Sequence, residues 1–318
     1  MRLPRLTPDG YRRVTLVALV LLVAIIVSGG AVRLTGSGLG CLHWPNCEGG
    51  HIVAATGYHA KIEYGNRIFT ALLSVAVIAA VLGALVREPR RRDLTWLSWG
   101  LVVGMIAQII LGAIVVKTDL VPSAVIAHFL LSIALIWDAA ALHQRAGHAD
   151  VPGTPIVGPR IRALSRVIVG LVLLVLVLGT LVTGSGPHSG DPHVAKRLGF
   201  DIEQVARVHG TAVVTLVAVV IGTLLYAWRS GAPAVVLRRG ELLLAVGIGQ
   251  AAVGYTQYFT GVPVLLVGIH LLGAVLVFLA ALHFHFGLWE WEPEPAAVAI
   301  AESRDSDATA GHALAGAG

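Results

Sequence analysis

The sequence predicts an all-α integral membrane protein with eight transmembrane helices, arranged as two pseudo-symmetric four-helix bundles. Three observations predict this fold. The 318-residue chain is 56% hydrophobic and 13% charged, with a mean hydropathy of +0.80, whereas a soluble domain of this length needs a far more charged surface. Eight apolar runs reach the length of about 20 residues that crosses a bilayer. The two halves of the chain also resemble each other.

The apolar runs define the predicted helices and domains. They lie near 14–32, 66–86, 96–116, 123–143, 165–184, 205–228, 241–259 and 262–286. A polar loop, rather than a cleavage site of small residues, follows the first run, so we interpret it as a retained helix. The predicted domains are a cytoplasmic N-terminus (1–13), a first bundle (14–143), a cytoplasmic linker (144–164), a second bundle (165–286) and a tail (287–318). The tail is rich in Ala, Gly and acidic residues without apolar periodicity, which predicts disorder.

Basic residues set the predicted orientation. If the N-terminus is cytoplasmic, 16 of the 23 Lys and Arg residues fall on the inner side of the membrane and 7 on the outer side. The positive-inside rule therefore places both termini in the cytoplasm. The pI of about 9.6 reflects this loop bias and does not indicate a nucleic-acid partner.

Several features recur in both halves of the chain. They are LTGSG (34–38) and VTGSG (182–186), Glu63–Arg67 and Glu203–Arg207, Gln108 and Gln250, Gly112 and Gly254, and His128 and His270. Both glutamines precede their histidine by 20 residues, and the two halves are offset by 142 residues at these positions. This agreement predicts an internal repeat of four helices. Because four is even, both copies cross in the same direction, so two equivalent sites are expected on one side of the membrane.

Three histidines mark the candidate sites. His128, His209 and His270 each lie six or seven residues below the outer end of their helix, or roughly 9–11 Å at the helical rise. Ionisable residues inside a membrane face the bundle interior and mark function. His209 and His270 lie on different helices of the second half, an arrangement that suits axial ligation of low-spin heme iron. Two alternatives stay open: another transition metal, or two histidines hydrogen-bonded between helices.

The first half does not repeat the histidine pair. Its second helix offers Asn66 near the depth of His128, so this site is expected to hold its ligand less symmetrically and to suit substrate exchange. Glu63 lies about one turn before Asn66 on the same helical face. As a partly desolvated carboxylate it is a candidate proton shuttle. The alternative is a helix-entry charge that reaches the interface or pairs with Arg67.

Each set of polar residues near the predicted outer rim has two possible roles. The basic residues there are Arg33, Lys61, Arg67, Lys196, Arg197 and Arg207. They are candidates to clamp heme propionates, or they anchor the helices at the interface. Gln108 and Gln250 either orient a ligand or hydrogen-bond between helices. Cys41 and Cys47 share the first outer loop, where an oxidising compartment favours a disulfide over a redox-active pair.

A family resemblance covers residues 12–286. GGAVRLTGSGLGC, IEYGNR, QIILGAIVV, AHFLLS, GTLVTGSGPHSGD, ARVHG and GIHLLGA together resemble the heme A synthases, membrane enzymes of cytochrome oxidase biogenesis. The resemblance implies oxidation of the C8 methyl group of heme O to a formyl group by successive hydroxylations. It also implies a heme b in the second half and the substrate in the first.

The resemblance assigns roles to particular residues. His209 and His270 match the heme b ligands, and His128 matches a histidine of the substrate site. Glu63 matches the glutamate of the family motif E-x-x-H-R, and the cysteine pair matches a disulfide. Asn66 departs from the histidine of that motif. Heme O is then held by His128 alone, or His59 substitutes, or Glu63 contacts the iron side.

The resemblance also suggests partners and a location. The candidates are heme O synthase, cytochrome oxidase assembly factors, membrane lipid and a second copy of the chain, in the cell membrane with both heme sites toward the outer face. A di-heme electron-transfer cytochrome is the main alternative, although it favours two complete histidine pairs. A transporter is a further alternative, but transporters have polar breaks at mid-membrane, whereas the polar groups here cluster near one face.

Overall fold

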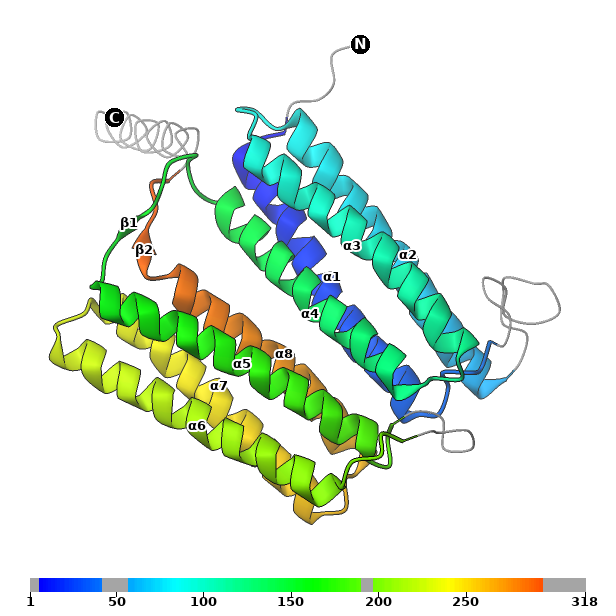
Figure 1. Ribbon diagram of the computed structural model, residues 1–318. Helices are drawn as coiled ribbons and strands as arrows, with labels where there is room; N and C mark the ends of the chain where they lie inside the picture. The colour runs from blue at the N-terminus through cyan, green and yellow to red at the C-terminus, as the bar shows by residue number, and fades with distance from the viewer. Residues whose placement is uncertain (1–5, 42–56, 190–196, 294–318) are drawn as a thin grey trace, which may run out of the picture.

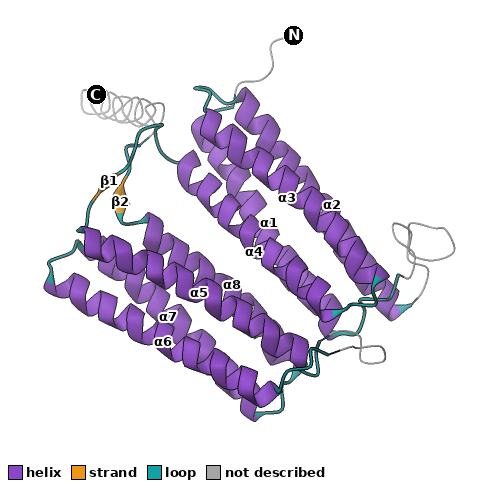
Figure 2. Ribbon diagram, in the orientation of Figure 1, coloured by secondary structure: helices purple, strands orange, loops and turns teal. Residues whose placement is uncertain are grey.

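The computed structural model describes residues 6–41, 57–189 and 197–293, which form long helices and one small sheet (Figure 1). The helices are α1 (Pro8–Leu34), α2 (Tyr58–Val86), α3 (Arg92–Lys117), α4 (Pro122–Ala146), α5 (Pro159–Ser185), α6 (Ile202–Arg229), α7 (Ala234–Phe259) and α8 (Val264–Phe286). The strands are β1 (Thr154–Pro155) and β2 (Trp289–Glu290). Figure 2 shows that almost all of the described chain is helical.

Most helices begin earlier than their apolar runs predicted. The largest difference is at α2, which begins at Tyr58 rather than near 66 and therefore includes the polar residues His59 and Glu63. A helix satisfies its own backbone hydrogen bonds, so it continues beyond the apolar core into the polar boundary of the membrane. Capping fixes some of the starts, as at α6, where the Asp201 side chain accepts hydrogen bonds from the backbone N–H groups of Glu203 and Gln204.

The described helices identify a multi-pass membrane protein. Seven of them are long and apolar enough to cross a membrane, and α7 is the exception among those described. The sequence predicted an eighth span there, and α7 has the length but not the composition, because Gln250, Thr256 and Gln257 interrupt its apolar second half. The all-α membrane class is therefore confirmed.

The helices pack mainly against their neighbours in sequence. α1 and α3 both pack against α2 and α4, and α5 and α7 both pack against α6 and α8. Contacts between these two sets join α8 to α1 and α4, and α4 to α5 (Figure 1). The buried side chains along this boundary are apolar, and the rings of Trp137 and Phe278 lie 6.0 Å apart between centroids.

The segment after α8 is ordered, in contrast to the predicted tail. β2 pairs antiparallel with β1, and the backbone N–H of Ala149 donates to the carbonyl oxygen of Glu292 at 2.9 Å. Leu288 is fully buried. The predicted disorder is therefore wrong for residues 287–293, because they pair with a linker segment far away in sequence. Residues 294–318 lie outside the described part of the chain.

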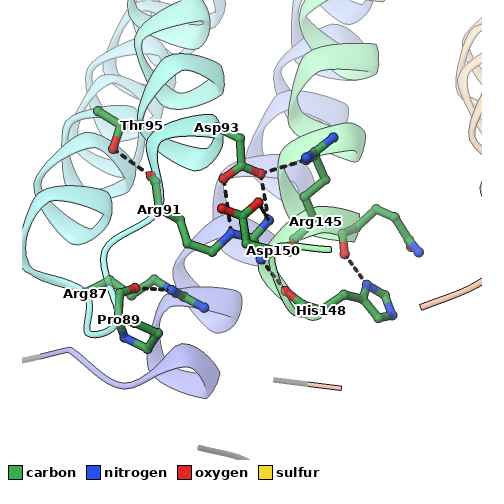
Figure 3. A network of polar contacts seen from close by, with 9 residues as sticks. Arg87, Pro89, Arg91, Asp93, Thr95, Arg145, His148 and Asp150 are labelled. Atoms are coloured by element: carbon green, nitrogen blue, oxygen red, sulfur yellow. Dashed lines mark hydrogen bonds and ion pairs between the residues drawn. The ribbon is translucent and has the colours of Figure 1, made fainter. Parts of the chain in front are cut away.

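An ion-pair network joins the start of α3 to the end of α4 (Figure 3). Arg91 donates to both carboxylate oxygens of Asp93, at 3.1 and 2.7 Å, and Arg145 donates to Asp93 at 2.7 Å. The Arg91 side chain is only 3% exposed, so these bonds compensate the burial of its charge. Burial and nearby arginines lower the pKa of His148 beside this network, since both oppose its protonated form.

Candidate functional site

The three histidines singled out by the sequence share one environment. His128 lies on α4, His209 on α6 and His270 on α8, and each side chain is partly buried. The Nδ1 atom of each is buried without a hydrogen bond of normal geometry to the described residues, although the Val175 backbone lies within reach of the His209 imidazole. A buried polar atom without a partner is costly unless a ligand satisfies it or fixes its ring. These imidazoles are therefore the leading candidate ligand groups.

Each imidazole lies against a glycine of the preceding helix. A Cβ atom added at Gly254 would lie 3.0 Å from Cε1 of His270, and one added at Gly179 would lie 3.2 Å from Cε1 of His209. The equivalent distance from Gly112 to His128 is 3.5 Å. Glycine is therefore the residue that lets these rings approach the neighbouring helix closely.

Sequence reasoning found two of these glycines and missed the third. Gly112 and Gly254 belong to the predicted repeat. Gly179 lies thirty residues before His209 on another helix. The only local signal for it is a glycine within an apolar run, one turn before VTGSG.

The two glutamines fix the backbone beside their histidines. Gln250 Nε2 donates to the carbonyl oxygen of His270 at 2.7 Å, and Gln108 Nε2 donates to that of His128 at 3.1 Å. Gln108 also donates to the Ser132 hydroxyl at 2.6 Å. Of the two predicted alternatives for these glutamines, the structure has the interhelical hydrogen bond.

His209 and His270 belong to the same half of the chain. They come from α6 and α8 and are near enough to interact electrostatically. No group of three or more His, Cys, Asp or Glu side chains within the described residues is arranged to hold a metal ion.

Glu63 fastens the first part of the α1–α2 loop to α2. Its side chain is buried, with Oε2 accepting from the Cys41 backbone N–H at 2.8 Å and Oε1 paired with Arg67 Nη2 at 2.6 Å. Arg67 also donates to the Cys41 carbonyl oxygen at 3.4 Å. The loop packs tightly here, because a Cβ at Gly40 would lie 2.5 Å from the His59 carbonyl oxygen.

The corresponding pair of the second half is in a different environment. Glu203 and Arg207 are 3.2 Å apart, but their side chains are 66% and 79% exposed, against 6% for Glu63 and 23% for Arg67. The same sequence spacing thus gives a buried ion pair bonded to the Cys41 backbone in one half and an exposed ion pair in the other. The sequence shows that each half has a Glu–Arg pair, but it does not show which of the two pairs is covered by a loop.

Asn66 and His59 both have hydroxyl partners that sequence reasoning missed. Asn66 Oδ1 accepts from the Ser28 hydroxyl of α1 at 2.9 Å. His59 Nδ1 is hydrogen-bonded to the buried Ser37 hydroxyl at 2.9 Å, and Ser37 belongs to the LTGSG segment. His59 lies seven residues before Asn66 on α2, or about 10 Å nearer the helix start. The two side chains therefore do not share a depth.

The remaining predicted rim and loop residues are only partly described. Arg33 Nε is buried without a hydrogen-bond partner among the described residues, while Lys61 and Arg197 are exposed. Lys196 and Cys47 lie outside the described residues. The pairing of Cys41 with Cys47 therefore stays a prediction.

Comparison with known proteins places the chain in a family. The family described as Cytochrome oxidase assembly protein (COX15-CtaA) matches residues 12–59 and 53–188, more than half of the chain. The chain belongs to this family. Glu63, Asn66 and His128 lie within the matched residues of the COX15-CtaA family, whereas His209 and His270 lie beyond them.

Curated relatives agree with the predicted resemblance. The chain is 28% identical over 162 residues to a heme A synthase of Exiguobacterium sibiricum, covering 49% of this chain and 52% of the relative. It is 30% identical over 125 residues to a heme A synthase of Geobacillus kaustophilus, covering 39% of each chain. A 69-residue stretch is 39% identical to a protoheme IX farnesyltransferase of Thermus thermophilus, covering 21% of this chain and 11% of the relative. The matches thus span about half, or less, of the relatives' length.

Proposed function

We propose that this protein is a heme A synthase, which oxidises the C8 methyl group of heme O to a formyl group by successive hydroxylations. The family and the names of its relatives support this function. The observation that carries the proposal is the placement of the histidines. Two interact electrostatically in the second half and one lies in the first, each beside a glycine of the preceding helix.

The fold that supports this function is a duplicated four-helix bundle, α1–α4 and α5–α8. Its outer sides share the glutamine–histidine bond and the glycine–histidine contact. Its inner ends share a second motif, in which His143 bonds the Thr15 hydroxyl at 3.0 Å and His285 bonds the Ser165 hydroxyl at 2.9 Å. Both termini are cytoplasmic, and both histidine sites open toward the outer face of the cell membrane.

The second bundle would hold heme b as a resident cofactor. His209 and His270 would hold its iron, because the two partly buried imidazoles come from different helices and interact electrostatically. When bound, this heme supplies one-electron transfer. Gln250 fixes the backbone that carries His270, and Gly179 and Gly254 let both rings approach their neighbouring helices closely.

The first bundle would hold the substrate, heme O. His128 is its histidine, and Asn66 does not replace the family's second one, because its amide oxygen is engaged by Ser28. His59 does not replace it either, since it lies about two turns nearer the helix start. Binding through a single histidine is weaker than through two, which suits a substrate that must leave as product.

At the mouth of the substrate site, Arg67 would pair with a substrate carboxylate and Glu63 would transfer a proton. In the structure Arg67 neutralises Glu63, and both hold the backbone of Cys41. A propionate of the substrate is a competing partner for Arg67. Once Arg67 turns to that propionate, Oε1 of Glu63 is free to accept or donate a proton beside the reacting methyl group.

Conversion of heme O to heme A tests the proposed function. The full chain is expressed with a heme O synthase, and the extracted pigments are separated by chromatography. We expect heme A from the wild type, and none from His128→Ala even though that variant keeps heme b. Wild-type protein that retains two hemes and yields only unmodified heme O would instead support the di-heme cytochrome.

A further inference from the structure

A cavity of about 360 Å³ lies at the end of the second half where α5 begins and α6 ends. It is lined by residues 156–161 and by Tyr226, Ser230 and residues 231–233 of the α6–α7 turn. Its volume is at the lower end of the range for ligand pockets, about 300–1,000 Å³. The proposed heme sites lie near the other ends of these helices, so the cavity is separate from them.

The polar groups of the cavity select an anion. Its only polar side chains are Arg160, Tyr226 and Ser230, and no acidic residue lines it. The Ser230 hydroxyl already donates to the Tyr226 carbonyl oxygen at 2.8 Å, which leaves the Arg160 guanidinium and the Tyr226 hydroxyl as donors for a ligand. Arg160 is exposed and makes no ion pair with any described residue.

The surrounding helix ends add positive charge without local neutralisation. No ion pair within the described part of the chain joins any arginine of this end to an acidic side chain. These arginines are Arg160, Arg162, Arg166, Arg229, Arg238 and Arg239. The first half differs, since its Arg91 and Arg145 both pair with Asp93 (Figure 3).

The corresponding place in the first half is closed. There the chain before α1 lies against the α2–α3 turn, with the Leu6 N–H donating to Val86 at 3.2 Å and the Glu88 N–H donating to Leu6 at 3.1 Å. The Thr7 side chain caps α1, whereas Gly158 gives α5 no side-chain cap. Within the described residues, no such backbone bonds join the chain before α5 to the α6–α7 turn.

We propose that this cavity binds the phosphate of an anionic phospholipid, from the membrane leaflet that faces the basic loops. The cavity lies at helix ends, which is where headgroup phosphates meet a spanning protein, and basic pockets between helices on this side bind such headgroups. Leu225 and Trp228, on the same turn of α6 as Tyr226, are 49% and 66% exposed and offer apolar surface for the acyl chains. A soluble phosphate would leave that surface unused.

Native mass spectrometry of the full-length protein with phosphatidylglycerol tests this site. Wild type is expected to retain one phosphatidylglycerol more strongly than phosphatidylcholine. Arg160→Gln should weaken that retention about tenfold, as expected for the loss of one charge-assisted hydrogen bond, and Tyr226→Phe by a smaller factor. Arg92→Gln is the matched control, because it removes an exposed arginine from the same end of the first half.

Three results would overturn the proposal. The first is retention of the lipid by Arg160→Gln at the wild-type level, and the second is an equal loss of lipid in Arg92→Gln. Displacement of phosphatidylglycerol by millimolar inorganic phosphate would assign the cavity to a soluble anion instead. Circular dichroism of each variant verifies folding, and none of these outcomes bears on heme oxidation.

Discussion

Substitution of Gly254 by alanine tests how the second half holds its heme. The added Cβ would lie 3.0 Å from Cε1 of His270. Ordinary carbon–carbon contacts are about 3.5–4.0 Å, so the imidazole or α7 must move by a few tenths of an ångström. Ligand groups need to be held within about 0.5 Å of their productive positions. We therefore expect Gly254→Ala to lower heme b affinity about 10- to 100-fold, the usual effect of disturbing a ligand's support.

The assay is titration of heme b into purified protein, followed by optical and electron paramagnetic resonance spectra. Gly249→Ala is the matched control on the same helix, since its added Cβ would meet no atom within 4 Å. Gly179→Ala, with a distance of 3.2 Å to His209, should act in the same direction but less strongly. Wild-type affinity and unchanged spectra in Gly254→Ala would refute the role assigned to the glycine contact.

Three further substitutions test other parts of the molecule. Glu63→Gln should keep heme b but lower heme A formation at least about tenfold, because an acid–base group is lost. The exposed Glu203→Gln is the control and should change neither heme b nor heme A. Equal losses of heme A in pigment extracts of both variants would contradict the role of Glu63. Asn66→His should add a second low-spin signal when heme O is bound, and an unchanged spectrum would show that residue 66 does not face the substrate. Asp93→Asn should destabilise the fold by about 1–3 kcal/mol, because it weakens the charge compensation of the buried Arg91. The Asp150 side chain is 63% exposed, so Asp150→Asn should cost less than about 1 kcal/mol. Equal shifts of the two variants in thermal unfolding would refute this.

The sequence predicts the features of this protein that repeat along the chain. Apolar runs locate all eight helices, and the equal spacing of Gln108 from His128 and of Gln250 from His270 matches an equivalent hydrogen bond in each half. These predictions succeed because each helix is a continuous run and because a fixed spacing survives in both halves. Helix ends are less well predicted, since the polar first turns of α2 carry no apolar signal.

The features that sequence reasoning missed depend on contacts between distant segments. His143 lies near the end of α4, where a solvated side chain is usual, yet it bonds the buried Thr15 hydroxyl of α1. The sequence gives the depth of a residue along its helix, but it does not give which neighbouring segment the side chain contacts. The same reason explains the missed Ser28–Asn66 bond and the strand formed by Trp289–Glu290.

The spin state and stoichiometry of heme in the purified protein test the central claim most directly. The account predicts one tightly bound low-spin heme b with two imidazole ligands, which is lost in both His209→Ala and His270→Ala and retained in His128→Ala. A colourless wild-type protein, or a low-spin heme that survives both second-half substitutions, would contradict it.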